Sequence, residues 1–171
     1  MCFTPLYSEL EGSQDLQRRV TPLRLLNIKS RGLLWFKCLL SHRMFHQSPL
    51  QILKNLGFID RVDSHDASII GVFCGQSYRD LLKRTALTDH PLMLKNNRNY
   101  PFKFLSFHRS HQIIEYVDAD HNRHVMKLLS LAKNKALIEN FPPYHAYYIG
   151  FLAGLLLARM KGVGCDYLWM P

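Results

Sequence analysis

A run of 13 apolar residues, from Ala146 to Ala158 in the segment HAYYIGFLAGLLLARMKG, constrains the fold of this chain more than any other feature. As a helix the run would extend about 20 Å, whereas a helix that spans a bilayer needs about 20 such residues. Only Arg159 and Lys161 could give it a charged face. A helix that is apolar on every side is buried against protein. The segment therefore predicts a buried packing helix over about 145–160, and no membrane partner.

Small residues recur at every fourth position of this segment, at Ala146, Gly150, Gly154 and Ala158. Residues four apart lie on one face of a helix. Because a glycine inside a helix costs about 1 kcal/mol relative to alanine, two of them on one face indicate that another backbone comes close. These four residues are therefore candidate interface residues. The sequence leaves open whether the contact joins two segments of one chain or two copies in a homodimer.

The charge of the chain favours an anionic partner. The 171 residues include 22 Lys and Arg against 13 Asp and Glu, a net charge of +9, and the hydrophobic content of 47% is enough for a core. The cysteines Cys2, Cys38, Cys74 and Cys165 are far apart in sequence, which excludes a CxxC motif or zinc-finger spacing. The first residues lack the apolar stretch of a secretory signal. These features predict a cytoplasmic protein with reduced thiols.

The pattern along the chain predicts a mostly α fold, with a polar N-terminal arm over 1–20 and a single helical domain over 21–171. Thr21-Pro22 opens a Leu-rich stretch that we interpret as one helix or two, and Ser48-Pro49 opens a helix that Gly57 closes. A further helix is expected over 121–139. Residues 101–117 alternate in two places and form either a short β-hairpin or a helix-entry loop. No internal repeat is visible.

Residues 66–87 match the requirements of a helix-turn-helix. Gly71 fits the crossing of two helices, Gly75 the turn, and Ser77 with Asp80 a capping box for the second helix, which Leu81 would anchor. That second helix would present hydrogen-bonding and basic groups to DNA. The candidate DNA-binding residues, including two from the following loop, are Gln76, Ser77, Tyr78, Arg79, Lys83, Arg84, Lys95 and Arg98. An ordinary helical hairpin with a solvated basic face is the alternative interpretation.

Motifs for catalysis are missing from the sequence, which has no GxSxG, P-loop or GxGxxG. His121 and His124 are three residues apart, so on a helix they could share a metal ion with Asp118 or Asp120. The same spacing is typical of a solvated helix start, and no HExxH is present. The prediction is a protein that is not an enzyme and that has no metal or other cofactor.

The run SYRDLLKRTAL, followed by a proline-containing loop and YPFKF, resembles the DNA-binding subunit of the flagellar master activator and its relatives on conjugative elements. The likeness covers residues 45–110. It implies a helical transcription activator with a helix-turn-helix and a smaller partner subunit, in which Arg79, Lys83 and Arg84 contact DNA. That family has a C-terminal cysteine cluster that binds zinc, whereas this chain has only Cys165 there.

Together these observations predict a DNA-binding transcriptional regulator. It would bind double-stranded DNA through a helix-turn-helix and a basic surface, and would form a homo-oligomer or pair with a second regulator subunit. One alternative is a protein–protein interaction module, such as an inhibitor or adaptor from a mobile element. The other is a metal-dependent enzyme that uses His121 and His124.

Overall fold

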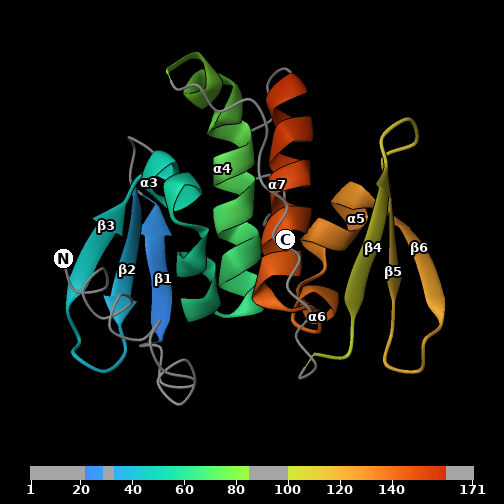
Figure 1. The fold of residues 1–171 in the computed structure, drawn as a ribbon, viewed down its shortest axis with the longest axis horizontal. Helices are drawn as coiled ribbons and strands as arrows, with labels where there is room; N and C mark the ends of the chain where they lie inside the picture. Colours follow the sequence, from blue (N-terminus) through green and yellow to red (C-terminus); the bar gives the residue numbers. More distant parts are fainter. Residues whose placement is uncertain (1–21, 29–32, 85–99, 161–171) are drawn as a thin grey trace. The chain divides into compact units, whose positions relative to one another are not determined.

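The computed structural model describes residues 22–28, 33–84 and 100–160, except for the side chains of 78–84. The fold is mixed α/β, with two three-stranded antiparallel sheets (Figure 1), so the prediction of a mostly α fold is wrong. The chain divides into two compact units, residues 1–63 and 64–171. The arm predicted over 1–20 lies outside the described residues.

The first unit is built on a sheet that we call sheet A. Its strands pair in chain order, and a short helix and a 3-10 helix follow them: β1 (Leu23–Ile28), β2 (Leu34–Cys38), β3 (Met44–Gln47), α3 (Pro49–Lys54) and η1 (Leu56–Arg61). The stretch that we predicted to be helical forms β1 and β2. Buried and half-buried residues alternate along β2, which is the period of a strand with one face on a core. Phe36 meets Phe58 of η1 edge to face at 4.8 Å.

The start of α3 agrees with the sequence. The Ser48 hydroxyl accepts a hydrogen bond from the backbone N–H of Gln51, the Gln51 side chain accepts one from the Ser48 N–H, and Pro49 occupies the first turn. The helix ends at Lys54, earlier than the predicted end at Gly57, which lies within η1.

The second unit begins with a long helix and holds the other sheet, sheet B. Its elements are α4 (Ser64–Arg84), β4 (Lys103–His108), β5 (Ile113–Val117), β6 (Arg123–Lys127), α5 (Leu128–Lys133), α6 (Lys135–Ile138) and α7 (Pro143–Arg159). The hairpin alternative for 101–117 is confirmed by β4 and β5. The helix predicted over 121–139 is wrong in its first part, which is β6. Phe104 packs on Tyr148 of α7 at 5.2 Å, so the inner face of sheet B covers that helix.

The predicted helix-turn-helix is wrong, because α4 is one continuous helix. Gly75 lies inside it and makes no turn, and Ser77 is far from its N-terminus, where a cap would have to be. Gly71 and Gly75 are both buried against α7. Their absent side chains allow two backbones to approach, which is the other common reason for glycine in a helix.

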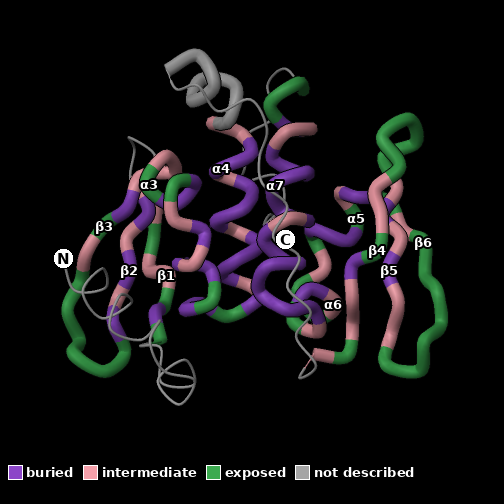
Figure 2. The backbone as a smooth tube through the Cα atoms, viewed as in Figure 1, coloured by how far each residue is buried: buried purple, intermediate pink, exposed green. Residues whose placement is uncertain are grey.

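Helices α4 and α7 lie side by side in the same direction, and both are largely buried along their contact (Figures 1 and 2). A β-carbon on Gly71 would lie 2.1 Å from the carbonyl oxygen of Tyr147, and one on Gly150 would lie 2.1 Å from that of Ser68. One turn further along, Gly75 meets the carbonyl of Phe151 in the same way, at 2.2 Å. The contact is reciprocal, because each helix places glycines against the other's carbonyls.

This reciprocity reflects an internal repeat, which the sequence analysis missed. Residues 52–75 align with 131–154 at an offset of 79 residues, and seven of these 24 positions are identical. The identical pairs are Lys54/Lys133, Asn55/Asn134, Ile59/Ile138, Ala67/Ala146, Ile70/Ile149, Gly71/Gly150 and Gly75/Gly154. The glycines of the helix contact are therefore the same two positions of the repeat, used once in each copy.

The element order repeats as well: three antiparallel strands, two short helical segments and a long helix occur twice. Each sheet has an irregularity at the same place, between Leu25 and Asn27 in β1 and between Phe104 and Ser106 in β4. A histidine adopts a positive φ in each second turn, 59° at His42 and 65° at His121. We therefore describe the chain as a first copy, residues 23–84, and a second copy, residues 103–159.

Candidate nucleic-acid interface

One face of sheet A carries polar, basic and aromatic side chains. The opposite, inner face holds Phe36 and Phe45, which both pack on Phe58. The residues that alternate with these, and that the strand register places side by side, make up what we call the outer face of sheet A: Arg24, Asn27, Trp35, Lys37, Met44 and His46. All six are exposed or half-buried, and Met44 keeps 66% of its surface exposed. The face is therefore accessible to a partner.

The charge on this face is of one sign. Arg24 and Lys37 are direct cross-strand partners, and two like charges opposite each other destabilise an antiparallel pair. The stretch from residue 16 to 59 contains no Asp or Glu, while its basic residues are Arg18, Arg19, Arg24, Lys29, Arg31, Lys37, Arg43 and Lys54. An anionic ligand bound near Arg24 and Lys37 would be attracted to both side chains, and this attraction would offset their mutual repulsion.

Aromatic and hydrogen-bonding groups accompany these cations. The rings of Trp35 and His46 lie 4.9 Å apart, tilted by 59°, and Asn27 is the cross-strand partner of Trp35 on its other side. Aromatic rings of this kind pack on sugars and bases, and an amide or imidazole can hydrogen-bond to base edges. The face thus combines groups that bind phosphates with groups that contact the rest of a nucleotide.

The outer face of sheet B has a related but weaker pattern. Lys103, Arg123 and Lys127 lie on it, with Glu115 among them. Glu115 accepts a hydrogen bond from Ser106 at 3.0 Å and lies 3.3 Å from an Arg123 guanidinium nitrogen. The hydrogen bond from Ser106, with further contributions from His108 and Arg123, lowers the pKa of this carboxyl. Glu115 thus stays ionised and offsets part of the positive charge on the outer face of sheet B, whereas the outer face of sheet A has no carboxylate among its six residues.

The structure places His121 and His124 differently from the predicted helix. His121 lies in the β5–β6 turn, whereas His124 lies on β6, where its Nε2 is 2.7 Å from an Asp118 carboxylate oxygen. Asp118 also accepts hydrogen bonds from the backbone N–H groups of Asp120 and Asn122. Within residues 22–28, 33–84 and 100–160, no three His, Cys, Asp or Glu side chains converge on a metal position.

These contacts predict the titration of Asp118. The hydrogen bond from His124, followed by that from the Asn122 N–H, lowers the pKa of Asp118 from its ordinary 3.8. Because the lowered value belongs to the folded state, the stability that it contributes is complete above pH 3.8 and is lost as the pH falls through the lowered value. We expect an NMR titration midpoint for Asp118 below 3.8, and a shift back toward 3.8 in His124→Ala. An unchanged midpoint in that variant would contradict the assignment.

Of the residues that the helix-turn-helix would present to DNA, the structure describes the side chains of only two. Gln76 and Ser77 are half-buried on α4. Tyr78, Arg79, Lys83 and Arg84 belong to the same helix, and their side chains lie outside the described residues, as do Lys95 and Arg98. The sequence reasoning missed Arg24 and Lys37 as a pair because it assigned them to a helix. A strand period of two would have brought them together.

The small-residue face of α7 contacts α4 of the same chain. Gly150 and Gly154 face α4 carbonyls, Ala146 is fully buried, and Ala158 is exposed near the helix end. Of the two arrangements that the sequence left open, the structure shows the contact within one chain. An oligomer stays a prediction.

Cys74 lies in the core of α4, and burial raises the pKa of its thiol to about 12, although a hydrogen bond with Tyr147 acts in the opposite direction. At neutral pH the thiol is therefore protonated, and it behaves as a small buried side chain rather than as a nucleophile.

In the described part of the chain, no helix has both the length and the apolar character needed to cross a bilayer. Neither a family model, nor a curated protein, nor a solved structure matches the chain. The resemblance to the flagellar activator subunit therefore stays a prediction.

Proposed function

We propose that this protein binds duplex DNA through the outer face of sheet A, with the outer face of sheet B as a second contact surface. The observation that carries the proposal is the cross-strand pair of Arg24 and Lys37 on an accessible face within a stretch free of carboxylates. The phosphates of DNA carry negative charge that attracts both side chains. When the protein neutralises these phosphates, the counterions bound to the DNA are released, which favours binding.

A β-sheet surface is a known means of reading DNA, because the major groove admits a two-stranded ribbon. On sheet A, the antiparallel pair β2 and β3 carries Lys37, Trp35 and His46 on one side. Lys37 suits a phosphate, His46 a base edge, and Trp35 a sugar or base face. This interface replaces the predicted recognition helix. A role in transcriptional regulation stays a prediction.

The test is a salt titration of duplex affinity with the full-length protein. For a 20-base-pair duplex we expect log Kd to rise linearly with log salt concentration, with a slope of about 0.9 for each phosphate contacted. Single-stranded DNA and duplex RNA of the same sequence serve as comparators. Tighter binding to either comparator, or an affinity for duplex DNA that does not change with salt, would contradict the proposal.

A further inference from the structure

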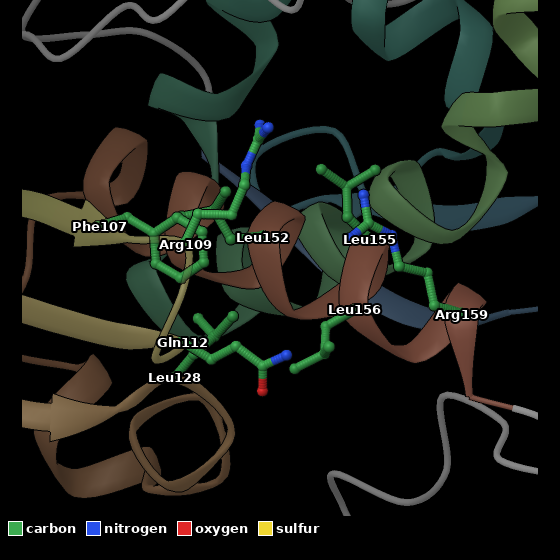
Figure 3. A pocket seen from close by; sticks show the side chains of 8 residues that line it. All are labelled: Phe107, Arg109, Gln112, Leu128, Leu152, Leu155, Leu156 and Arg159. Atoms are coloured by element: carbon green, nitrogen blue, oxygen red, sulfur yellow. The ribbon is translucent and has the colours of Figure 1, made fainter.

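A hollow beside α7 in the second copy is too small for an organic ligand (Figure 3). It is lined by Phe107, by leucines of α5 and α7, and by Arg109, Gln112 and Arg159. Its cavity volume of about 60 Å³ holds a few water molecules at most. Apolar side chains that the fold leaves exposed are therefore a better guide to a partner than this hollow.

Exposed apolar side chains gather at the turn between β2 and β3. In the described part of the chain six large apolar residues are exposed, and three of them lie close together in sequence: Leu39, Leu40 and Met44. We call these three residues the apolar tip. Leu40 keeps 69% of its surface exposed and Met44 keeps 66%, and every residue from 39 to 44 is exposed (Figure 2). Single exposed apolar residues are ordinary, whereas a group of them often marks a contact site.

The apolar tip has a defined position beside the proposed DNA interface. The Cys38 N–H donates a hydrogen bond to the Arg43 carbonyl at 2.9 Å, and the His42 N–H donates one to the Cys38 carbonyl at 2.8 Å, so the turn is closed by its own backbone. Met44 pairs with Lys37 at the last cross-strand position before the turn. Its side chain therefore lies on the outer face of sheet A, beside a cation.

The second copy has no apolar tip and provides an internal control. Its corresponding turn, residues 118–122 with the sequence DADHN, is closed by backbone hydrogen bonds of the same kind and contains two acidic residues and no leucine. At the first position of the third strand, where sheet A has Met44, sheet B has Arg123. The same arrangement of strands therefore forms without leucine or methionine at these places, and the fold does not require the apolar tip.

A DNA duplex offers these side chains one kind of apolar group in its major groove. Phosphates and the hydrogen-bonding atoms of the base edges do not suit leucine or methionine, whereas the C5-methyl group of thymine does. An anionic lipid surface would also attract apolar and basic residues, but three side chains supply little apolar area for membrane attachment. Asn27 and His46 on the same face suit base edges instead.

We propose that the apolar tip contacts thymine methyl groups in the major groove and makes the interface of sheet A selective for them. Lys37 beside Met44, and Arg43 within the turn, hold the neighbouring phosphates. This inference rests on the proposed DNA binding and adds to it a preference among bases.

The experiment compares duplexes that differ only in methyl groups. One is a mixed sequence of about 20 A·T pairs, and the other is the same duplex with uracil in place of every thymine. The full-length protein should bind the thymine form about fourfold more tightly for each methyl group that the apolar tip covers. In a duplex of G·C pairs, methylation of cytosine at C5 places a methyl group in the major groove and should tighten binding in the same way. Fluorescence anisotropy near 0.1 M salt measures all four affinities.

Two double variants assign this preference to the apolar tip. Leu40→Ala with Met44→Ala should fold normally, because both side chains are exposed, and should bind the thymine and uracil forms equally. Leu105→Ala with Met160→Ala is the matched control, since it removes an exposed leucine and an exposed methionine outside sheet A and should keep the preference.

The outcomes separate this proposal from the DNA interface itself. Salt-dependent binding with equal affinity for the thymine and uracil forms overturns the methyl contact alone, as does a preference that persists in the Leu40 and Met44 variant. Absence of salt-dependent duplex binding overturns both proposals. Binding to vesicles of anionic phospholipid that requires Leu40 and Met44, without duplex binding, would assign the apolar tip to a membrane surface and overturn both proposals as well.

Discussion

Replacing Gly154 with alanine is expected to destabilise the protein by about 3 kcal/mol. The new β-carbon would lie 2.1 Å from the carbonyl oxygen of Val72, whereas real β-carbons essentially never come within 3.0 Å of another atom. Overpacking in cores costs about 1–3 kcal/mol even when side chains can adjust. Here the obstacle is backbone, so α4 and α7 have to separate along their contact, and the cost should reach the upper end of that range.

The measurement is thermal and denaturant unfolding followed by circular dichroism. A loss of about 3 kcal/mol corresponds to a fall in Tm of about 10 °C in a chain of this size. Ala158→Leu is the matched control, because it enlarges an exposed residue on the same helix and should change stability by less than about 0.5 kcal/mol.

The repeat sharpens this prediction. Gly75 faces Phe151 as Gly154 faces Val72, so Gly75→Ala should cost the same as Gly154→Ala within about 1 kcal/mol. Unequal effects of several kcal/mol would show that the contact is not reciprocal in solution. If Gly154→Ala is as stable as the unmodified protein, the close approach of the two helices is wrong.

The sequence predicts α7 well because several signals agree there. Pro143 lies at the helix start, the residues are apolar on all sides, and small residues follow at a spacing of four. In α4 the same glycine spacing is present at Gly71 and Gly75, but polar residues follow it, which favoured a turn. A glycine that allows a turn and a glycine that allows another backbone to approach look the same in sequence. They differ only in whether a second helix packs against them. Only the repeat could have distinguished them from sequence.

Strands were harder to predict because the alternation of buried and exposed residues extends over only a few positions in each. β2 alternates over just five residues, among leucines that equally suit a helix. β6 is an edge strand with exposed side chains at four of its five positions, so it has no buried face and no hydrophobic period. The candidate interface depends on these strands. Arg24 and Lys37 are 13 residues apart in sequence, and only the register of β1 and β2 makes them neighbours.

Arg24→Gln combined with Lys37→Gln should weaken duplex DNA binding roughly 10- to 100-fold near 0.1 M salt. If each residue contacts one phosphate, their removal should also reduce the slope of log Kd against log salt concentration by about 2. The variant should fold normally, because it removes a like-charge cross-strand pair from an accessible face. Fluorescence anisotropy across a salt series measures both quantities.

The control for net charge is Lys54→Gln with Lys133→Gln. These lysines are exposed, occupy equivalent positions at the ends of α3 and α5, and lie on neither outer face. Both double variants lower the net charge from +9 by two, so a general attraction between protein and DNA would weaken them equally. A larger loss in the sheet variant assigns the effect to the outer face of sheet A.

Arg79→Gln with Arg84→Gln decides between the sheet and the helix. These residues would be the main contacts if α4 acted as a recognition helix despite its continuous course. The sheet interface predicts that this variant behaves like the lysine control. If it instead loses more affinity than the Arg24 and Lys37 variant, DNA is bound by the end of α4. The like-charge pair Arg24 and Lys37 on sheet A would then be expected to bind an anion other than DNA.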